Sequence, residues 1–206
     1  MLKIGLTGGI GTGKTEVSNI LQTLGATVIY ADEVAHSFYA PGMPVWREIV
    51  NEFGESVLDA DGEIDRAKLG RIVFTDERLL SRLNEIVHPK TRSAIEKRLQ
   101  LMFEGGKKGV VVEIPLLVES ILKGNSWGLI FDEIWVMSSD KGKVIQRVMN
   151  RSQLDKDSVL FRIESQVPQK TRLSYADVVI HNDGTLTQLK HQVTSLWHQK
   201  NHEFNR

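Results

Sequence analysis

Five short apolar runs alternate with long segments of helical period along this chain. The runs comprise Lys3 to Thr7, Thr27 to Tyr30, Gly109 to Ile114, Glu133 to Met137 and Asp177 to Ile180. They lack the polar-apolar alternation of a strand with one solvent face, which favours parallel strands buried on both faces. The connecting segments are long enough for helical crossovers. The pattern therefore predicts an α/β fold, a doubly wound parallel sheet of about five strands.

Residues 32–108, between the second and third runs, are too long for a simple crossover. This segment contains the turn signals Pro41-Gly42 and Asp61-Gly62. Helical period extends from Asp76 to Val87 and resumes after Pro89, which predicts that the first helix ends or kinks there. We predict a mostly helical substrate lobe over about 32–108.

Residues 139–176 form a second long segment, with two basic helices predicted, and are a candidate lid. The core of the single domain, residues 1–206, would then comprise 1–31, 109–138 and 177–198. A closing helix through Trp197 completes it.

A glycine-rich loop follows the first run. Residues Gly8 to Thr15 fit the phosphate-loop pattern G-x-x-x-x-G-K-[S/T] of P-loop NTPases in full. Its glycines allow the backbone amides to approach phosphate oxygens, and the positive end of the following helix, from Glu16 to Leu24, favours an anion. Lys14 supplies a mobile charge, and the Thr15 hydroxyl is a ligand suited to Mg²⁺. The predicted nucleotide-binding residues are Gly9, Gly11, Thr12, Gly13, Lys14, Thr15 and Glu16; the alternative is a glycine-rich turn without a ligand.

The nucleotide is predicted to be ATP, because the sequence contains no N-K-x-D-like guanine reader. Asp59 to Gly62 matches D-x-x-G, but a tight turn is the simpler interpretation of those four residues. Asn182, which follows the last run, is a candidate contact for the adenine.

Two further features suggest phosphoryl transfer. Asp32 follows the second run, and ligands of open α/β sheets bind beyond the carboxyl ends of strands, so Asp32 could orient or deprotonate an acceptor hydroxyl. Alternatively it only caps the helix from Glu33. Lys143, Arg147 and Arg151 have the spacing of one helical face, which suits a polyphosphate or, alternatively, a solvated surface balanced by Asp140 or Asp155.

Composition narrows the class of protein further. Lys plus Arg and Asp plus Glu both number 26, which argues against charge-driven binding to nucleic acid or membranes. The absence of cysteine excludes disulfides and thiol nucleophiles. The sequence opens directly on a predicted strand, and its apolar runs are too short to span a bilayer, so a cytoplasmic location is expected. The oligomeric state is left open.

Nearly the whole chain resembles the dephospho-coenzyme A kinase family. The shared features, in order, are Ile4 to Thr15, Ala31-Asp32, Phe53-Gly54, Asp61-Gly62, Asp65-Arg66, Leu69, Val73-Phe74, Leu83 to Pro89, Ile114 to Glu119, Gln146 to Arg151, Gln166, Ala176-Asp177 and Asn182. The family transfers the ATP γ-phosphate to the ribose 3′-hydroxyl of dephospho-coenzyme A.

The resemblance implies specific roles. Asp32 corresponds to the base or hydroxyl-orienting carboxylate, Arg147 to a lid arginine that reaches the phosphates, and Arg66 and His88 to residues lining the acceptor side. His88 before Pro89 could instead be part of a structural turn. Departures from the family pattern are threonine at 12 and 15 where serine is usual, Glu16 for threonine, Tyr30 for aspartate and Glu113 for aspartate. Of these, Glu113 leaves its own role open.

Two other functions remain compatible with the residues. One is a different small-molecule kinase on the same core, acting on a nucleoside monophosphate or shikimate. The other is a P-loop switch, in which residues 31–108 dock a partner protein and ATP turnover is only regulatory.

Overall fold

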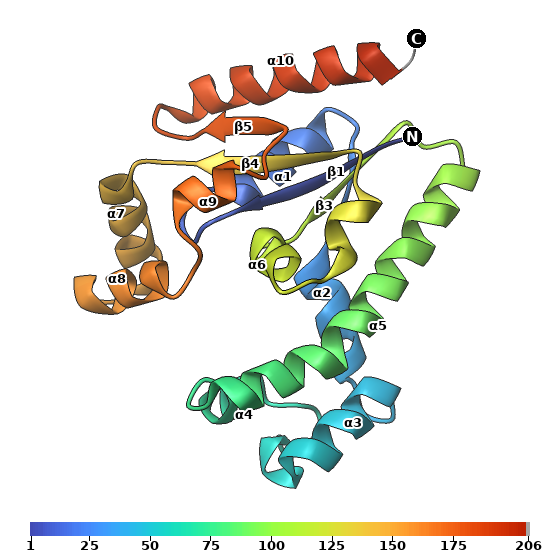
Figure 1. Ribbon diagram of the computed structural model, residues 1–206, viewed down its shortest axis with the longest axis vertical. Coiled ribbons are helices and arrows are strands. Elements are labelled where there is room, and N and C mark those ends of the chain that lie inside the picture. The colour runs from blue at the N-terminus through green and yellow to red at the C-terminus, as the bar shows by residue number, and fades with distance from the viewer. Residues whose placement is uncertain (205–206) are drawn as a thin grey trace. The chain divides into compact units, whose positions relative to one another are not determined.

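A computed structural model of the chain describes residues 1–204 and forms two compact units, one of Met1–Ile29 with the chain from Leu101 onward, the other of Tyr30–Gln100. Its strands are β1 (Leu2–Gly8), β2 (Thr27–Tyr30), β3 (Gly109–Glu113), β4 (Glu133–Ser138) and β5 (Val178–His181). They form one sheet in the order β2-β3-β1-β4-β5, with β1 parallel to β3 and β4, and β4 parallel to β5 (Figure 1). The predicted five-stranded parallel sheet is confirmed.

Helices cover both faces of the sheet. Leu2, Ile4 and Leu6 of β1 pack in a core with α1 (Lys14–Thr23) and α10 (Leu186–Phe204). Gly5 faces the other side, where a methyl group in its place would lie 2.9 Å from Leu117 Cδ2 of α6 (Leu117–Leu122). Burial on both faces explains the continuous apolar runs. The closing helix α10 is longer than the sequence predicted.

The segment predicted as a lid contains three helices rather than two. They are α7 (Lys141–Ser152), α8 (Lys156–Glu164) and α9 (Gln169–Leu173), and a short 3₁₀ helix, η3 (Ser126–Ile130), precedes β4. Val144, Val148 and Val159 form a small apolar cluster between α7 and α8, and Ile10 of the glycine-rich loop packs against it. The loop and these helices are thus in direct contact within one unit.

Residues 30–100 form a helical unit with its own core. Its helices are α2 (Ala31–His36), η1 (Ser37–Tyr39), α3 (Pro44–Phe53), η2 (Glu55–Val57), α4 (Arg66–Val73) and most of α5 (Glu77–Glu104). Their apolar faces meet around Val45, Ile49 and Leu69. Asp59 Oδ1 accepts hydrogen bonds from the Asp61 and Glu63 amides, and Gly62 has φ 77°, so the D-x-x-G stretch is a tight turn.

Pro89 does not end a helix, because α5 continues from Glu77 to Glu104 with the proline inside it. Figure 1 shows α5 bending near its middle. A proline has no amide hydrogen for the carbonyl four residues earlier, which bends a helix without necessarily stopping it. Of the two outcomes expected at Pro89, the kink is therefore the correct one.

Among residues 1–204, none of the helices is both long enough and apolar enough to cross a membrane.

Candidate active site

The glycine-rich loop joins β1 to the N-terminus of α1. Its Lys14 Nζ donates hydrogen bonds to the carbonyls of Gly8 and Gly9, at 2.8 and 3.1 Å. The buried Thr12 hydroxyl donates to the Gly9 carbonyl at 2.8 Å. These contacts hold the loop in a curve around the ammonium group, with the exposed Thr15 hydroxyl and the half-buried Glu16 on the first turn of α1.

Asn182, directly after β5, packs against this loop. Its Nδ2 donates to the Thr12 carbonyl at 2.9 Å, and its amide donates to the Ser138 carbonyl at 2.8 Å. Gly13 has φ 97°, and a Cβ there would lie 2.3 Å from Asn182 Nδ2. Glycine is required at this position for both its backbone conformation and its close contact. Asn182 therefore connects the end of β5 to the phosphate loop.

Arg147 is directed at the same place from α7. Its guanidinium donates to Ser139 Oγ at 3.0 Å and to the Asn182 carbonyl at 2.7 Å. Lys143 Nζ donates to the Asp183 carbonyl, whereas Arg151 is exposed to solvent. Asp140 and Asp155, expected as alternative partners of these cations, cap the N-termini of α7 and α8 instead. The cationic face is thus turned toward the loops after β4 and β5.

Asp183 belongs to this cluster as well. Its carboxylate accepts hydrogen bonds from the Asp140 amide at 2.6 Å and the Ser139 hydroxyl at 2.9 Å. The Asp140 hydrogen bond is the main reason that the pKa of Asp183 lies below its ordinary value. Its negative charge stays in place at neutral pH and balances Lys143.

Glu113 ends β3 beside the first turn of α1. It is buried, its Oε2 accepts a hydrogen bond of 2.5 Å from the Ser18 hydroxyl, and its Oε1 lies 3.5 Å from the Thr15 hydroxyl. The sequence left the role of this glutamate open. Its position brings a carboxylate and a threonine hydroxyl together, the hard oxygen ligands that Mg²⁺ prefers. Among residues 1–204 no cluster of three or more histidine, cysteine, aspartate or glutamate side chains suits a metal.

Asp32, Arg66 and His88 all belong to the unit of residues 30–100. Asp32 is exposed in the first turn of α2, whose N-cap residue is Tyr30, so the interpretation of Asp32 as the cap is wrong. Arg66 is the exposed first residue of α4, and His88 is half-buried inside α5, which excludes a structural turn at that position.

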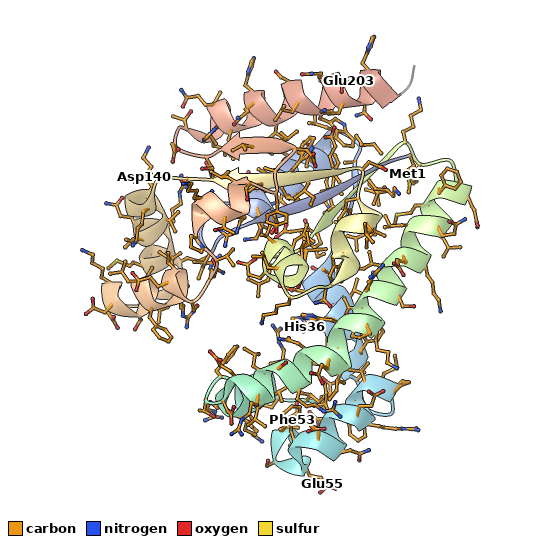
Figure 2. All side chains as sticks on the ribbon, in the orientation of Figure 1. Met1, His36, Phe53, Glu55, Asp140 and Glu203 are labelled. Carbon is orange, nitrogen blue, oxygen red and sulfur yellow. The ribbon has the colours of Figure 1, made fainter. Side chains whose placement is uncertain are left out.

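His36 and Tyr39 lie close to Asp32 and Arg66. His36, labelled in Figure 2, is one helical turn after Asp32, and its ring meets the Tyr39 ring edge-on with centroids 5.6 Å apart. Burial, assisted by the nearby Arg66 charge, lowers the pKa of His36, while burial raises the pKa of Tyr39. Both rings are therefore uncharged at neutral pH beside the Asp32 carboxylate.

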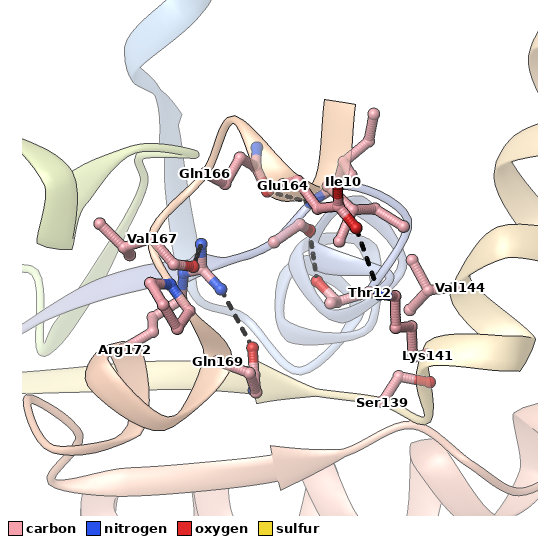
Figure 3. A pocket seen from close by; sticks show the side chains of 13 residues that line it. Ile10, Thr12, Ser139, Lys141, Val144, Glu164, Gln166, Val167, Gln169 and Arg172 are labelled. Carbon is pink, nitrogen blue, oxygen red and sulfur yellow. Dashed lines mark hydrogen bonds and ion pairs between the residues drawn. The ribbon is translucent and has the colours of Figure 1, made fainter. Parts of the chain in front are cut away.

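The sequence pattern did not predict that Gln166 would lie against the phosphate loop. Gln166 lines a cavity of about 360 Å³ together with Ile10 and Thr12 of the loop. Figure 3 shows these side chains. Gln166 and Ile10 are hydrogen-bonded although they are 156 positions apart, so no local period indicates their contact. Gln166 is one of the residues shared with the resembling family, but the resemblance implies no role for it.

The parallel sheet, the loop between β1 and α1 and the cations of α7 define the class of P-loop phosphotransferases. The chain belongs to the dephospho-CoA kinase family, whose model matches residues 2–188.

A relative and two solved structures are similar to nearly the whole chain. A dephospho-CoA kinase of Carboxydothermus hydrogenoformans is 39% identical, with 94% of this chain and 91% of the relative covered. The crystal structure of TT1252 from Thermus thermophilus superimposes with a TM-score of 0.80 at 29% identity, covering 96% of this chain and 97% of that one. Dephospho-CoA kinase from Campylobacter jejuni gives a TM-score of 0.74 at 26% identity, with 98% of each chain covered.

Proposed function

We propose that this chain transfers the γ-phosphoryl group of ATP to the ribose 3′-hydroxyl of dephospho-CoA, giving CoA and ADP in the last step of CoA biosynthesis. The observation that carries the proposal is the family match over residues 2–188, a range that contains both the phosphate loop and Asp32. We place the reaction in the cytoplasm.

The nucleotide side of the reaction is assigned to residues around the loop. Backbone amides from Gly9 to Thr15 and the N-terminus of α1 would bind the phosphates. Lys14 and Arg147 would stabilise the charge that develops on the transferred group. Asn182 lies against the loop at Thr12, in a position that suits contact with the nucleoside.

Thr15 and Glu113 are the residues that would hold Mg²⁺. The exposed Thr15 hydroxyl and the buried Glu113 carboxylate lie 3.5 Å apart, so their oxygen atoms fit a hard divalent cation or a water in its shell. When bound, the ion supplies neutralisation of charge on the β- and γ-phosphate oxygens.

The acceptor side is assigned to the helical unit of residues 30–100, which we propose as the substrate lobe. Asp32 would accept the hydrogen bond of the ribose 3′-hydroxyl and orient its oxygen, taking up its proton as the new bond forms. Arg66 and His88 would contact other parts of the acceptor. Residues 139–176 would act as the lid.

An acceptor screen tests this function directly. Purified protein with ATP and Mg²⁺ is mixed with dephospho-CoA, a nucleoside monophosphate or shikimate, and ADP release is measured in a coupled assay. Dephospho-CoA should be the productive acceptor, and CoA should accumulate in step with ADP. Turnover only with the nucleoside monophosphate or shikimate would show that dephospho-CoA is not the substrate. Slow ATP hydrolysis without any phosphorylated acceptor would favour the alternative of a P-loop switch whose ATP turnover is only regulatory.

Arg147→Ala is expected to raise the KM for ATP and lower kcat, by roughly ten- to a hundredfold in kcat/KM, because it removes a charged donor worth about 1.5–3 kcal/mol. Steady-state kinetics with varied ATP measure the effect. Arg151→Ala is the matched control, since Arg151 lies one turn further along α7 and is exposed; it should change kcat/KM by less than about twofold. Equal effects of the two substitutions would contradict the role given to Arg147.

Glu113→Gln is expected to raise the Mg²⁺ concentration needed for half-maximal activity by about tenfold, the usual effect of altering a group close to a metal ion. The amide retains the hydrogen bond to Ser18 but loses the charge. Mg²⁺ titrations at saturating ATP check this. Glu77→Gln, at an exposed position at the start of α5, should leave the titration unchanged. An unchanged Mg²⁺ titration for Glu113→Gln would contradict the proposal that Glu113 helps to hold the metal ion.

A further inference from the structure

The turn between α8 and α9 contacts the phosphate loop through one side chain. Gln166 Oε1 accepts a hydrogen bond of 2.9 Å from the Ile10 amide, a contact that spans 156 positions in sequence. Figure 3 shows Gln166 beside Ile10 at the cavity described above. Ile10 lies between the last residue of β1, Gly8, and the first residue of α1, Lys14, so this hydrogen bond fixes a part of the loop that belongs to neither element.

Gln166 approaches the loop from a firmly anchored turn. Gln169, the first residue of α9, donates from Nε2 to the Met137 carbonyl of β4 at 3.2 Å. Arg172, which is 2% exposed, forms an ion pair of 2.8 Å with Glu119 and donates to Gln169 Oε1 at 3.0 Å and the Val167 carbonyl at 3.2 Å. The turn is therefore tied to β4 and to α6, and it presents the Gln166 amide from a fixed position.

The loop also approaches this turn closely. A Cβ added at Gly9 would lie 3.3 Å from Gln166 Oε1 and 3.3 Å from Arg172 Nη1. Because the backbone of Gly9 and Ile10 rests on these side chains, its conformation depends on them. A neutral amide oxygen satisfies the Ile10 amide without placing a negative charge next to bound polyphosphate.

We propose that Gln166 is a positioning residue, which holds the Ile10 amide and so keeps the phosphate loop in its nucleotide-binding conformation. The proposal rests on the proposed function, in which that loop binds ATP. Gln166 acts through the loop and contributes to ATP affinity, with little effect on the acceptor.

Gln166→Ala is expected to raise the KM and the Kd for ATP by roughly three- to tenfold, the effect of losing one hydrogen bond that orders a binding loop. The KM for dephospho-CoA should stay within about twofold. Gln166→Glu retains an acceptor oxygen but adds a negative charge near the phosphates. Its Kd for ATP should rise by at least as much and approach the wild-type value as salt is increased, because salt screens the repulsion.

Gln169→Ala is the matched control. It removes the same type of side chain three residues further along, at the start of α9, where its contacts are with Met137 and Arg172 rather than with the loop. It should lower the melting temperature while leaving the Kd for ATP within about twofold of wild type. Calorimetric titration with ATP and thermal unfolding measure the two quantities for all variants.

The outcomes are separable. If the wild-type protein does not bind ATP, the proposed function and this proposal both fail. If it binds ATP and Gln166→Ala binds it equally well, only the role of Gln166 is overturned. A Gln169→Ala variant with the same loss of ATP affinity would also overturn it, since stability of the turn would then be the cause. Should Gln166→Ala fail to fold, the salt dependence of Gln166→Glu decides.

Discussion

Asp32→Asn is expected to lower kcat by about a thousandfold, within the range typical of removing a general base, while the Kd for ATP changes by less than about twofold. Asparagine has nearly the same shape as aspartate but cannot take up the proton of the 3′-hydroxyl. Asp32 is exposed and does not cap α2, so no structural contact that the fold requires is lost. Single-turnover phosphoryl transfer and equilibrium ATP binding measure the two quantities separately.

Glu33→Gln provides the matched control, because Glu33 is the neighbouring exposed acid in the first turn of α2. It should retain kcat within about twofold. A large loss of ATP affinity in Asp32→Asn would mean that Asp32 serves the nucleotide instead of the acceptor. Unchanged turnover would show that another group deprotonates or orients the hydroxyl.

The sheet was predictable from sequence for a physical reason. Strands of a parallel sheet that are covered by helices on both faces are largely apolar, and β1 places Leu2, Ile4 and Leu6 on one face and Gly5 on the other. The burial that stabilises the sheet is therefore visible in the sequence as short apolar runs. The phosphate loop was equally recognisable, because its tight path requires glycine at particular positions, as Gly13 shows with φ 97° and its close contact with Asn182.

Features that depend on distant residues were less accessible. Pro89 lowers the helical propensity of one position. Buried residues before it, Ile86 and Val87, and after it, Ile95, are held by tertiary packing, which favours a continuous helix with a bend. A short stretch of sequence indicates the helical propensity but not the tertiary packing. The same applies to Gln166, whose hydrogen bond with Ile10 has no counterpart in any local pattern.

For the candidate site, the sequence offered candidate residue types but could not indicate which of them meet in the fold. Lys143, Arg147 and Arg151 share a spacing, yet Arg147 alone of the two arginines reaches the Asn182 carbonyl. Which member of a cationic face meets a loop depends on where α7 packs on the sheet. Likewise, whether Asp32 caps α2 depends on where that helix begins, a boundary that propensity does not define to one residue.

Lys14→Met should lower kcat by roughly a hundred- to a thousandfold, comparable to removing one preorganised charge from a transition state, and weaken ATP binding by about tenfold. Methionine retains much of the length of the side chain but has no positive charge. Lys14 Nζ donates hydrogen bonds to the Gly8 and Gly9 carbonyls, which positions the ammonium group within the loop.

The effect of Lys14→Met should exceed that of Arg147→Ala, because Lys14 is part of the loop itself, whereas Arg147 approaches from α7. Lys190→Met, at an exposed position on α10, is the control and should have wild-type kinetics. Steady-state assays with varied ATP give both kinetic constants, and a melting curve shows whether the loop substitution has altered the fold. If Lys14→Met retained kcat within about tenfold, the transferred phosphoryl group would have to draw its stabilisation chiefly from the backbone amides and from Arg147.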